Sequence, residues 1–183
     1  TYPIDREYVA EELGFDDLSQ NSIDGVSDRD FIIEFLSIAA TISMHLSRFS
    51  EEIILWSSSE FNYIELDDSY STGSSIMPQK RNPVVLEHIR GVLSDLIGKN
   101  SSVITVTHNI PMTDTDDINS QIVPPVFEMF RKLTTVNRIL SDLFNSLKLN
   151  EELLEERVQV DFSSVTGLAD TLVSDYGVPF RDA

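Results

Sequence analysis

The residues best suited to chemistry lie in one polar run, Ser71-Thr72-Gly73-Ser74-Ser75-Ile76-Met77-Pro78-Gln79-Lys80-Arg81-Asn82-Pro83. Its first half is small, polar and therefore mobile, and a serine beside a glycine can approach a bound molecule closely. Its second half places two cations and an amide before a predicted helix N-terminus, which favours anions. Lys80 could stabilise negative charge that develops on a carboxylate when the neighbouring carbon loses a proton. Taken alone, a Gly-Ser-Ser tract is usually a flexible linker.

Helices predicted from apolar periodicity must position this run. A short helix is expected from about Asp5 to Leu13, where Gly14 stops it. A longer helix is expected with Ser27 as its N-cap, because apolar residues then recur every three or four positions. A helix of about 30 residues would extend roughly 45 Å, which predicts an elongated bundle. The stripe expected to be buried is Phe31, Phe35, Ile38, Ile42, Leu46, Phe49 and Ile53.

Two further long helices are expected. One follows the polar run, with Asn82 as N-cap and Pro83 at the first helical position. The other begins near Pro124 or Pro125, and a strand is suggested only at 103–106. The buried residues expected are Leu86, Ile89, Leu93 and Leu96 in the first of these helices and Phe127, Phe130, Leu133, Val136, Leu140, Leu143 and Leu147 in the second.

The pattern shortens after Leu149. Asn150 is expected to cap one small helix, and Ser163 or Ser164 another that ends at Gly177.

The expected fold class is therefore all-α, a long-helix bundle followed by part of a small helical domain. Residues 1–149 form the expected central domain, with the polar loop at about 67–83, and residues 150–183 begin the C-terminal domain. Both ends are expected to be cut ends, because Thr1 carries no methionine before it and Pro179 opens a helical turn with little chain after it.

Composition excludes several classes of protein. The 183 residues carry a formal charge of −18, so a basic nucleic-acid-binding surface is not expected. The absence of cysteine excludes disulfides and thiolate chemistry and fits the cytoplasm. Serines, Thr41 and His45 interrupt the apolar stretch 35–47, so no membrane span is expected. The carboxylates Asp114, Asp116 and Asp117 lack a defined ligand spacing and are expected to form a solvated turn, with no metal bound.

The whole polar run resembles the signature of the fumarase/aspartase superfamily, whose members eliminate fumarate from succinyl substrates. Its Met77-Pro78-Gln79-Lys80 form is similar to the argininosuccinate lyases, although the ending Lys80-Arg81-Asn82-Pro83 also resembles adenylosuccinate lyases. Further similarity to argininosuccinate lyases lies in Thr1-Tyr2-Pro3-Ile4-Asp5-Arg6, Leu13-Gly14-Phe15, the segment 21–30, His45-Leu46-Ser47-Arg48-Phe49 and, more weakly, Gly177-Val178-Pro179-Phe180-Arg181.

This resemblance implies β-elimination of fumarate from argininosuccinate, without a metal or organic cofactor. It implies that Ser74 takes the Cβ proton, that Lys80 stabilises the resulting aci-carboxylate and that Glu87 orients a histidine. Because a free serine is a poor base, nearby cations and backbone donors must lower its proton affinity when the loop closes. The resemblance further implies that the substrate is bound by Arg29, Asn82 and Ser75.

Each assigned role has a structural alternative, and one segment departs from the family. Asn82 could be only an N-cap, Glu87 a first-turn partner of the helix dipole, and Arg29 a surface ion-pair member. The departure is at 110–119, where Asp114, Asp116 and Asn119 stand in place of a family tyrosine, lysine and glutamine that help to hold the arginine portion. The alternatives are therefore another fumarate-releasing lyase, such as an adenylosuccinate lyase, or a non-catalytic crystallin-like structural protein.

The resemblance also implies a homotetramer formed through the helical bundle, with each active site built from several subunits. The N-terminal domain of the family, which carries the histidine that Glu87 would orient, is not in these 183 residues. We therefore expect the chain by itself to be inactive.

Overall fold

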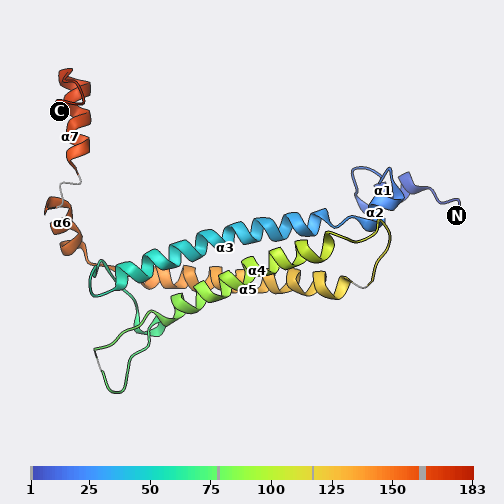
Figure 1. The fold of residues 1–183 in the computed structure, drawn as a ribbon, viewed down its shortest axis with the longest axis horizontal. Coiled ribbons are helices and arrows are strands. Elements are labelled where there is room, and N and C mark those ends of the chain that lie inside the picture. Colours follow the sequence, from blue (N-terminus) through green and yellow to red (C-terminus); the bar gives the residue numbers. More distant parts are fainter. Residues whose placement is uncertain (1, 78, 117, 161–163) are drawn as a thin grey trace. The chain divides into compact units, whose positions relative to one another are not determined.

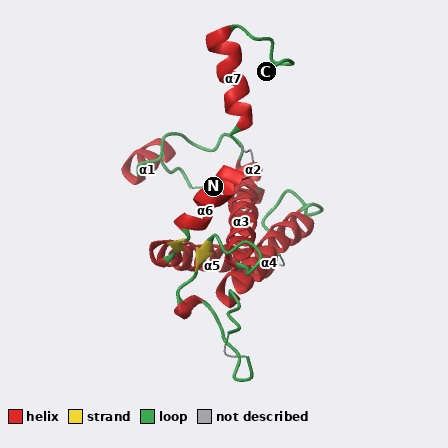
Figure 2. Ribbon diagram, turned by 90° about the vertical axis from the view of Figure 1, so that its left-hand side faces the viewer, coloured by secondary structure: helices red, strands yellow, loops and turns green. Residues whose placement is uncertain are grey.

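The computed structural model describes residues 2–77, 79–116, 118–160 and 164–183, and helices dominate these ranges (Figures 1 and 2). The long helices are α3, α4 and α5, and the two short strands pair antiparallel, Ile64 with Leu149 and Glu65 with Lys148. The all-α prediction is confirmed. The bounds are α1 Arg6–Leu13, α2 Ser22–Ser27, α3 Asp30–Ser57, β1 Ile64–Glu65, the 3-10 turn η1 Asp68–Tyr70, α4 Val84–Thr107, α5 Asn119–Ser146, β2 Lys148–Leu149, α6 Glu151–Val160 and α7 Val165–Tyr176.

The chain divides into two compact units, and the first comprises Thr1–Leu46 and Gly91–Val136. Within it, ion pairs link α4 to α5, including that between Lys132 and Asp95. Its core is largely apolar, and the side chains with at most 1% exposure are Leu36, Leu93, Leu96, Val103, Ile122 and Met129, together with the polar Ser43.

The second unit comprises Ser47–Arg90 and Asn137–Ala183. Within it, the rings of Phe49 and Phe144 stack with centroids 4.8 Å apart and so join α3 to α5. Arg90 of α4 forms an ion pair with Glu51 of α3. Its core consists of Ile53, Ile64, Leu66, Leu86, Ile89, Leu140 and Leu143.

The helix α1 begins and ends as predicted. The Asp5 carboxylate accepts a hydrogen bond from the backbone N–H of Tyr8, which satisfies a free donor of the first turn. Gly14 ends the helix at φ 75°, a left-handed conformation that glycine adopts without a Cβ clash.

The predicted N-cap of α3 is wrong. Ser27 is the last residue of α2, where its hydroxyl donates to the Ile23 carbonyl. The Asp28 carboxylate instead accepts the N–H of Asp30, 2.8 Å away, so this acid supplies the capping bond. The helix begins at Asp30, two residues later than an N-cap at Ser27 predicts, because α2 intervenes.

The predicted buried stripe of α3 is also wrong over most of its length. Phe31 is 64% exposed and Ile38 56%, whereas Leu36 and Ser43 are fully buried. The buried face is lined largely by small residues, which allow neighbouring helices to approach closely. Of the predicted stripe, Ile53 is buried and Leu46 half-buried, while Phe31, Phe35, Ile38, Ile42 and Phe49 are exposed.

In α4, Leu86, Ile89, Leu93 and Leu96 are buried, as predicted. The suggested strand at 103–106 is wrong, because these residues continue α4 and only Val103 is buried there. A long helix with a packed face overrides the strand preference of β-branched residues.

The third long helix, α5, begins earlier than predicted. Pro124 and Pro125 lie inside it, because the helix starts at Asn119, where the backbone N–H bonds the Asp116 carbonyl. The predicted core face of α5 is confirmed at Val136, Leu140 and Leu143 and is wrong in the earlier turns. Ile122, Met129, Val136, Leu140 and Leu143 are buried, while the predicted Phe127 and Phe130 are 71% and 64% exposed and Leu133 and Leu147 are half-buried.

The small C-terminal helices have the predicted cap at Asn150 and the predicted end at Gly177, but Ser164 makes no side-chain capping bond. The Asn150 side chain accepts from the N–H of Leu153 at the start of α6, and Gly177 ends α7 at φ 65°. Ser164 stands at the N-cap of α7, and Ser163 lies outside the described residues. The domain boundary near residue 149 stays a prediction.

By length and apolar composition alone, α3 could cross a membrane. The core helix of a water-soluble protein meets the same two criteria. The expectation that this segment is not a membrane span therefore stays a prediction.

Candidate functional site

The polar run forms a loop whose two ends are joined. Thr72 and Asn82 pair as an isolated antiparallel bridge, and each backbone N–H donates to the other residue's carbonyl over 2.9 Å. We call this bridge the neck of the loop. It pins the loop directly before α4, so the residues between the two ends emerge from a fixed base.

Ser74 lies two residues beyond the neck and is half-buried. Its Oγ accepts hydrogen bonds from the backbone N–H groups of Ile76, at 3.2 Å, and Met77, at 3.3 Å. Donors directed at an oxygen stabilise its deprotonated form. The local turn thus supplies backbone donors of the kind expected for a serine base, whereas the neighbouring Ser75 is exposed.

Lys80 lies two residues before the neck on the returning strand and is exposed. Counted from the Thr72–Asn82 pair, Ser74 and Lys80 occupy opposite positions of the hairpin. A Cβ added to Gly73 would lie 3.5 Å from the Lys80 carbonyl oxygen, which indicates that the two strands stay close beyond the neck. The loop therefore brings the serine and the lysine to the same end of the hairpin.

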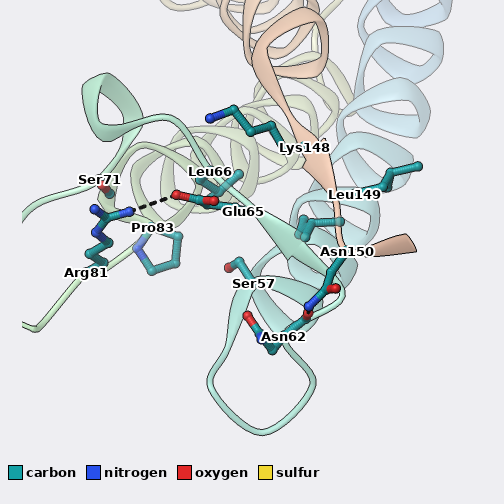
Figure 3. A pocket seen from close by; sticks show the side chains of 11 residues that line it. Ser57, Asn62, Glu65, Leu66, Ser71, Arg81, Pro83, Lys148, Leu149 and Asn150 are labelled. Carbon is teal, nitrogen blue, oxygen red and sulfur yellow. Dashed lines mark hydrogen bonds and ion pairs between the residues drawn. The ribbon is translucent and has the colours of Figure 1, made fainter. Parts of the chain in front are cut away.

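Arg81 pairs with two carboxylates at the base of the loop. Its Nη1 lies 3.1 Å from Glu65 Oε1 (Figure 3). The same atom lies 3.3 Å from Asp68 Oδ1. Glu65 belongs to β1 and Asp68 to η1, so a single guanidinium ties the returning strand to the segment that precedes the loop. Arg81 also lines a cavity of about 530 Å³, together with Ser57, Asn62, Ile64, Glu65, Leu66, Ser71, Pro83, Lys148, Leu149 and Asn150.

The segment before the loop is held by Asp67. Its carboxylate accepts from the Ser69 hydroxyl at 2.6 Å and from the Ser69 N–H at 2.9 Å, which caps η1. These two bonds lower the pKa of Asp67, and the bond from the Ser69 hydroxyl has the larger effect. Desolvation opposes them by raising the pKa, and the charge of Lys148 lowers it further. Asp67 therefore stays ionised and keeps Asp68 in position for Arg81.

Asn150 stabilises another side of the cavity through hydrogen bonds. Its backbone N–H donates to the Tyr63 carbonyl at 2.9 Å, and its side-chain amide donates to the Asn62 carbonyl at 3.2 Å. Asn62 has φ 51°, a left-handed conformation that asparagine tolerates better than most residues. This contact holds the turn that leads from α3 into β1.

Asn82 does not cap α4 as predicted. Its carbonyl accepts from Thr72 and from Val84, and α4 starts at Val84 with the Pro83 carbonyl accepting from Glu87. The residue before a proline favours extended backbone, and the bridge to Thr72 uses that conformation. The Asn82 side chain is half-buried, and Glu87 is exposed in the first turn of α4.

Arg29 belongs to the first unit, whereas the other predicted site residues belong to the second. Its Nη1 donates to the carbonyls of Val26, at 3.1 Å, and Asp28, at 2.7 Å. It therefore caps the C-terminal end of α2, a structural task that the sequence did not predict.

The acidic segment before α5 forms a turn that leads into the helix. Asp116 accepts a bond from the Asn119 side chain at 3.2 Å, Asp114 is exposed, and Asp117 lies outside the described residues. Among the described residues, no three His, Asp or Glu side chains gather as metal ligands would.

The residues that sequence reasoning missed are the partners of Arg81. Glu65 and Asp68 precede the polar run, and no periodic pattern marks them. The sequence did contain one signal for these partners: carboxylates precede the loop and two adjacent cations end it.

Comparison with known proteins gives one matching family and close full-chain similarity. The family described as Lyase matches residues 1–98. An argininosuccinate lyase of Listeria monocytogenes is 48% identical over 183 residues, 100% of this chain and 40% of that protein. An argininosuccinate lyase of Bacillus pumilus is 45% identical with the same coverage. The chain thus spans about two fifths of the length of these curated relatives.

A solved structure of an EDDS lyase variant with bound fumarate superposes with a TM-score of 0.78 at 31% identity. The alignment covers 98% of this chain and 35% of that one.

Proposed function

Since the chain belongs to the lyase family, we propose that the protein containing it splits argininosuccinate into fumarate and arginine by β-elimination. The observation that carries the proposal is the similarity of the entire chain, at 45% and 48% identity, to argininosuccinate lyases. The relative solved with bound fumarate supports the fumarate half of the reaction.

Ser74 is the proposed base. It would take a proton from Cβ of the succinyl portion, and the backbone donors of Ile76 and Met77 would stabilise its deprotonated form before that step. The cluster of donors supports this role, because an isolated serine hydroxyl has too high a pKa to act at neutral pH.

Lys80 is the proposed partner of the charge that follows. The electron pair of the broken C–H bond delocalises into the adjacent carboxylate, and an ammonium beside that carboxylate stabilises the aci-carboxylate. Collapse of this intermediate forms the carbon–carbon double bond and breaks the bond from Cα to nitrogen. The departing nitrogen takes up one proton, so the products are fumarate and arginine.

The remaining proposed site residues serve binding and orientation. Asn82 and Ser75 would bind the succinyl portion, Glu87 would orient a histidine from another part of the protein, and Arg29 would contact the arginine end. The amine half of the substrate is less strongly supported, because Asp114, Asp116 and Asn119 depart from the argininosuccinate lyase pattern.

The test is a steady-state assay of the native protein that contains this chain, with ultraviolet detection of fumarate. Argininosuccinate is expected to be a far better substrate than adenylosuccinate, and the reverse preference would replace the proposed substrate. Ser74→Ala should lower kcat by about 10²- to 10⁴-fold, the usual contribution of a general base. The matched control is Ser101→Ala, an exposed serine of α4 away from the loop. Equal activity of the two variants would remove Ser74 from the mechanism.

We also propose that the protein is a homotetramer in the cytoplasm, with no nucleic-acid or membrane partner. The tetramer is supported by the large apolar side chains that α3 leaves exposed within the first unit, where Phe31 and Ile38 are 64% and 56% exposed. Such exposed apolar surface marks association sites. Sedimentation of the native protein tests the stoichiometry, and Phe31→Ser is expected to shift it toward smaller species.

A further inference from the structure

Two adjacent cations at the end of the loop have different surroundings. Arg81 contacts Glu65 and Asp68, whereas Lys80 forms no ion pair with any residue in the described part of the chain. Both residues could attract a carboxylate, so the protein must determine which of them faces the substrate.

We propose that Arg81 is a positioning residue, whose ion pairs with Glu65 and Asp68 fix the register of the returning strand so that Lys80 faces the reacting carboxylate. This inference rests on the proposed lyase function. It adds three residues to that function, Arg81, Glu65 and Asp68, none of which touches substrate.

The argument starts from the alternation of side chains in extended backbone. Successive residues of extended backbone point to opposite faces, so an extended segment ending at the Asn82 bridge is expected to place Lys80 and Asn82 on one face and Arg81 on the other. Across the neck, Thr72 pairs with Asn82, and Ser74 lies opposite Lys80. With Arg81 held by the carboxylates on one face, the serine and the lysine share the opposite face.

A slip of one residue would reverse this arrangement. It would carry Lys80 toward the carboxylates and Arg81 to the face of Ser74. The position across the neck from Arg81 is Gly73, which adds no side chain to oppose such a slip. The ion pairs therefore provide a restraint that the backbone bridge alone lacks.

The chemistry of the two cations explains which one the carboxylates hold. A guanidinium is planar and carries five donors, so it can bridge two carboxylates, whereas an ammonium is a compact point charge. In this structure Nη1 reaches both Glu65 and Asp68. Arg81 is thus the better partner for this pair of acids, and Lys80 remains unpaired for the substrate.

The ion pairs of Arg81 are weak enough to allow the loop to move. The side chains of Arg81, Glu65 and Asp68 are 55%, 61% and 77% exposed, and exposed ion pairs contribute little each. Loss of both pairs should therefore change the population of the correct register by about two- to tenfold.

The test removes the acceptors and leaves both cations in place. In the native protein, Glu65→Gln with Asp68→Asn should raise amide hydrogen exchange at Thr72 and Asn82 and lower kcat by about two- to tenfold. KM should change less than kcat, because a slipped strand still presents a cation to the carboxylate. A general structural defect would instead lower the unfolding temperature.

Two further variants complete the design. Arg81→Glu combined with Glu65→Arg and Asp68→Asn restores one ion pair of reversed polarity without setting two carboxylates against each other, and should recover most of kcat and the slow exchange. The control, Glu60→Gln with Glu156→Gln, removes two exposed carboxylates of the second unit and should change neither quantity.

Unchanged exchange at the neck in the Glu65→Gln, Asp68→Asn variant would overturn the inference, whatever the activity. Faster exchange with unchanged kcat would overturn the positioning role. A native protein that releases no fumarate from succinyl substrates would count against the proposed function, and the exchange measurement would still decide whether Arg81 restrains the loop.

Discussion

A cluster of ion pairs within the first unit gives a quantitative prediction about stability. Glu128 of α5 accepts from Lys132, 2.6 Å away, and from Lys99 of α4. Lys132 also lies 2.9 Å from Asp95 of α4. The hydrogen bond from Lys132, then that from Lys99, lowers the pKa of Glu128 from 4.5 to about 2, against the opposing effect of desolvation. The carboxylate therefore stabilises the folded state when ionised.

The size of the effect follows from the pKa and the exposure. A fall from 4.5 to about 2 corresponds to about 3.4 kcal/mol at roughly 1.36 kcal/mol per pKa unit. The Glu128 side chain is 28% exposed and its two lysine partners 27%, so water screens part of this interaction. We expect Glu128→Gln to lower the free energy of unfolding by about 1–2 kcal/mol at neutral pH.

The sign of the pH dependence follows from linkage. Because the folded pKa is lower than the unfolded one, the stabilisation is complete above pH 4.5 and is lost as the pH falls toward 2. The difference in stability between the wild type and Glu128→Gln should therefore shrink across this range.

Urea unfolding of the native protein at neutral pH and at successive acidic pH values measures this difference. Glu34→Gln provides the control, since Glu34 is exposed on α3 in the same unit and forms no ion pair among the described residues. A Glu128→Gln variant as stable as the wild type at neutral pH would refute the reasoning. So would a difference in stability that stayed constant between neutral pH and the acidic limit.

Four further substitutions test the packing and the caps. Leu93→Ala removes a fully buried side chain of α4 and should lower the free energy of unfolding by about 2–5 kcal/mol in denaturant titrations. Phe127→Ala alters a side chain that is 71% exposed and should change the free energy of unfolding of the dissociated subunit by less than about 0.5 kcal/mol. Asn150→Ala loses the side-chain bonds to the Asn62 carbonyl and the Leu153 N–H and should cost about 1–2 kcal/mol, with faster amide exchange at the start of α6. Asp5→Ala removes the N-cap of α1 and should reduce the protection of its first-turn amides, at a cost of about 0.5–2 kcal/mol.

Local signals in the sequence predicted the elements that depend on neighbouring residues. Asp5 and Gly14 bound α1 as expected, and Asn150 and Gly177 mark the ends of C-terminal helices. The hydrogen bonds of a cap join residues a few positions apart, so their chemistry is visible in the chain. The polar loop was recognised for the same reason, because its residues are contiguous.

The buried face of α3 could not be predicted in this way. The helix carries one stripe with Phe31 and Ile38 and another with Leu36, Ala39 and Ser43, and only the second is buried. The prediction from apolar periodicity chose the stripe with the larger side chains as the buried one. The choice between two stripes depends on how closely the neighbouring helices approach, and small residues permit the closer approach.

What the sequence by itself determined is the all-helical class, the place of the polar loop and the residue types on which the proposed chemistry depends. Only the tertiary structure decided which side of each long helix is buried, where α5 begins and that Arg81 turns toward Glu65 and Asp68. The buried faces and the Arg81 ion pairs join residues far apart along the chain. Their geometry depends on how whole helices and loops pack together. A local pattern of residue types specifies neither the distances nor the directions of that packing.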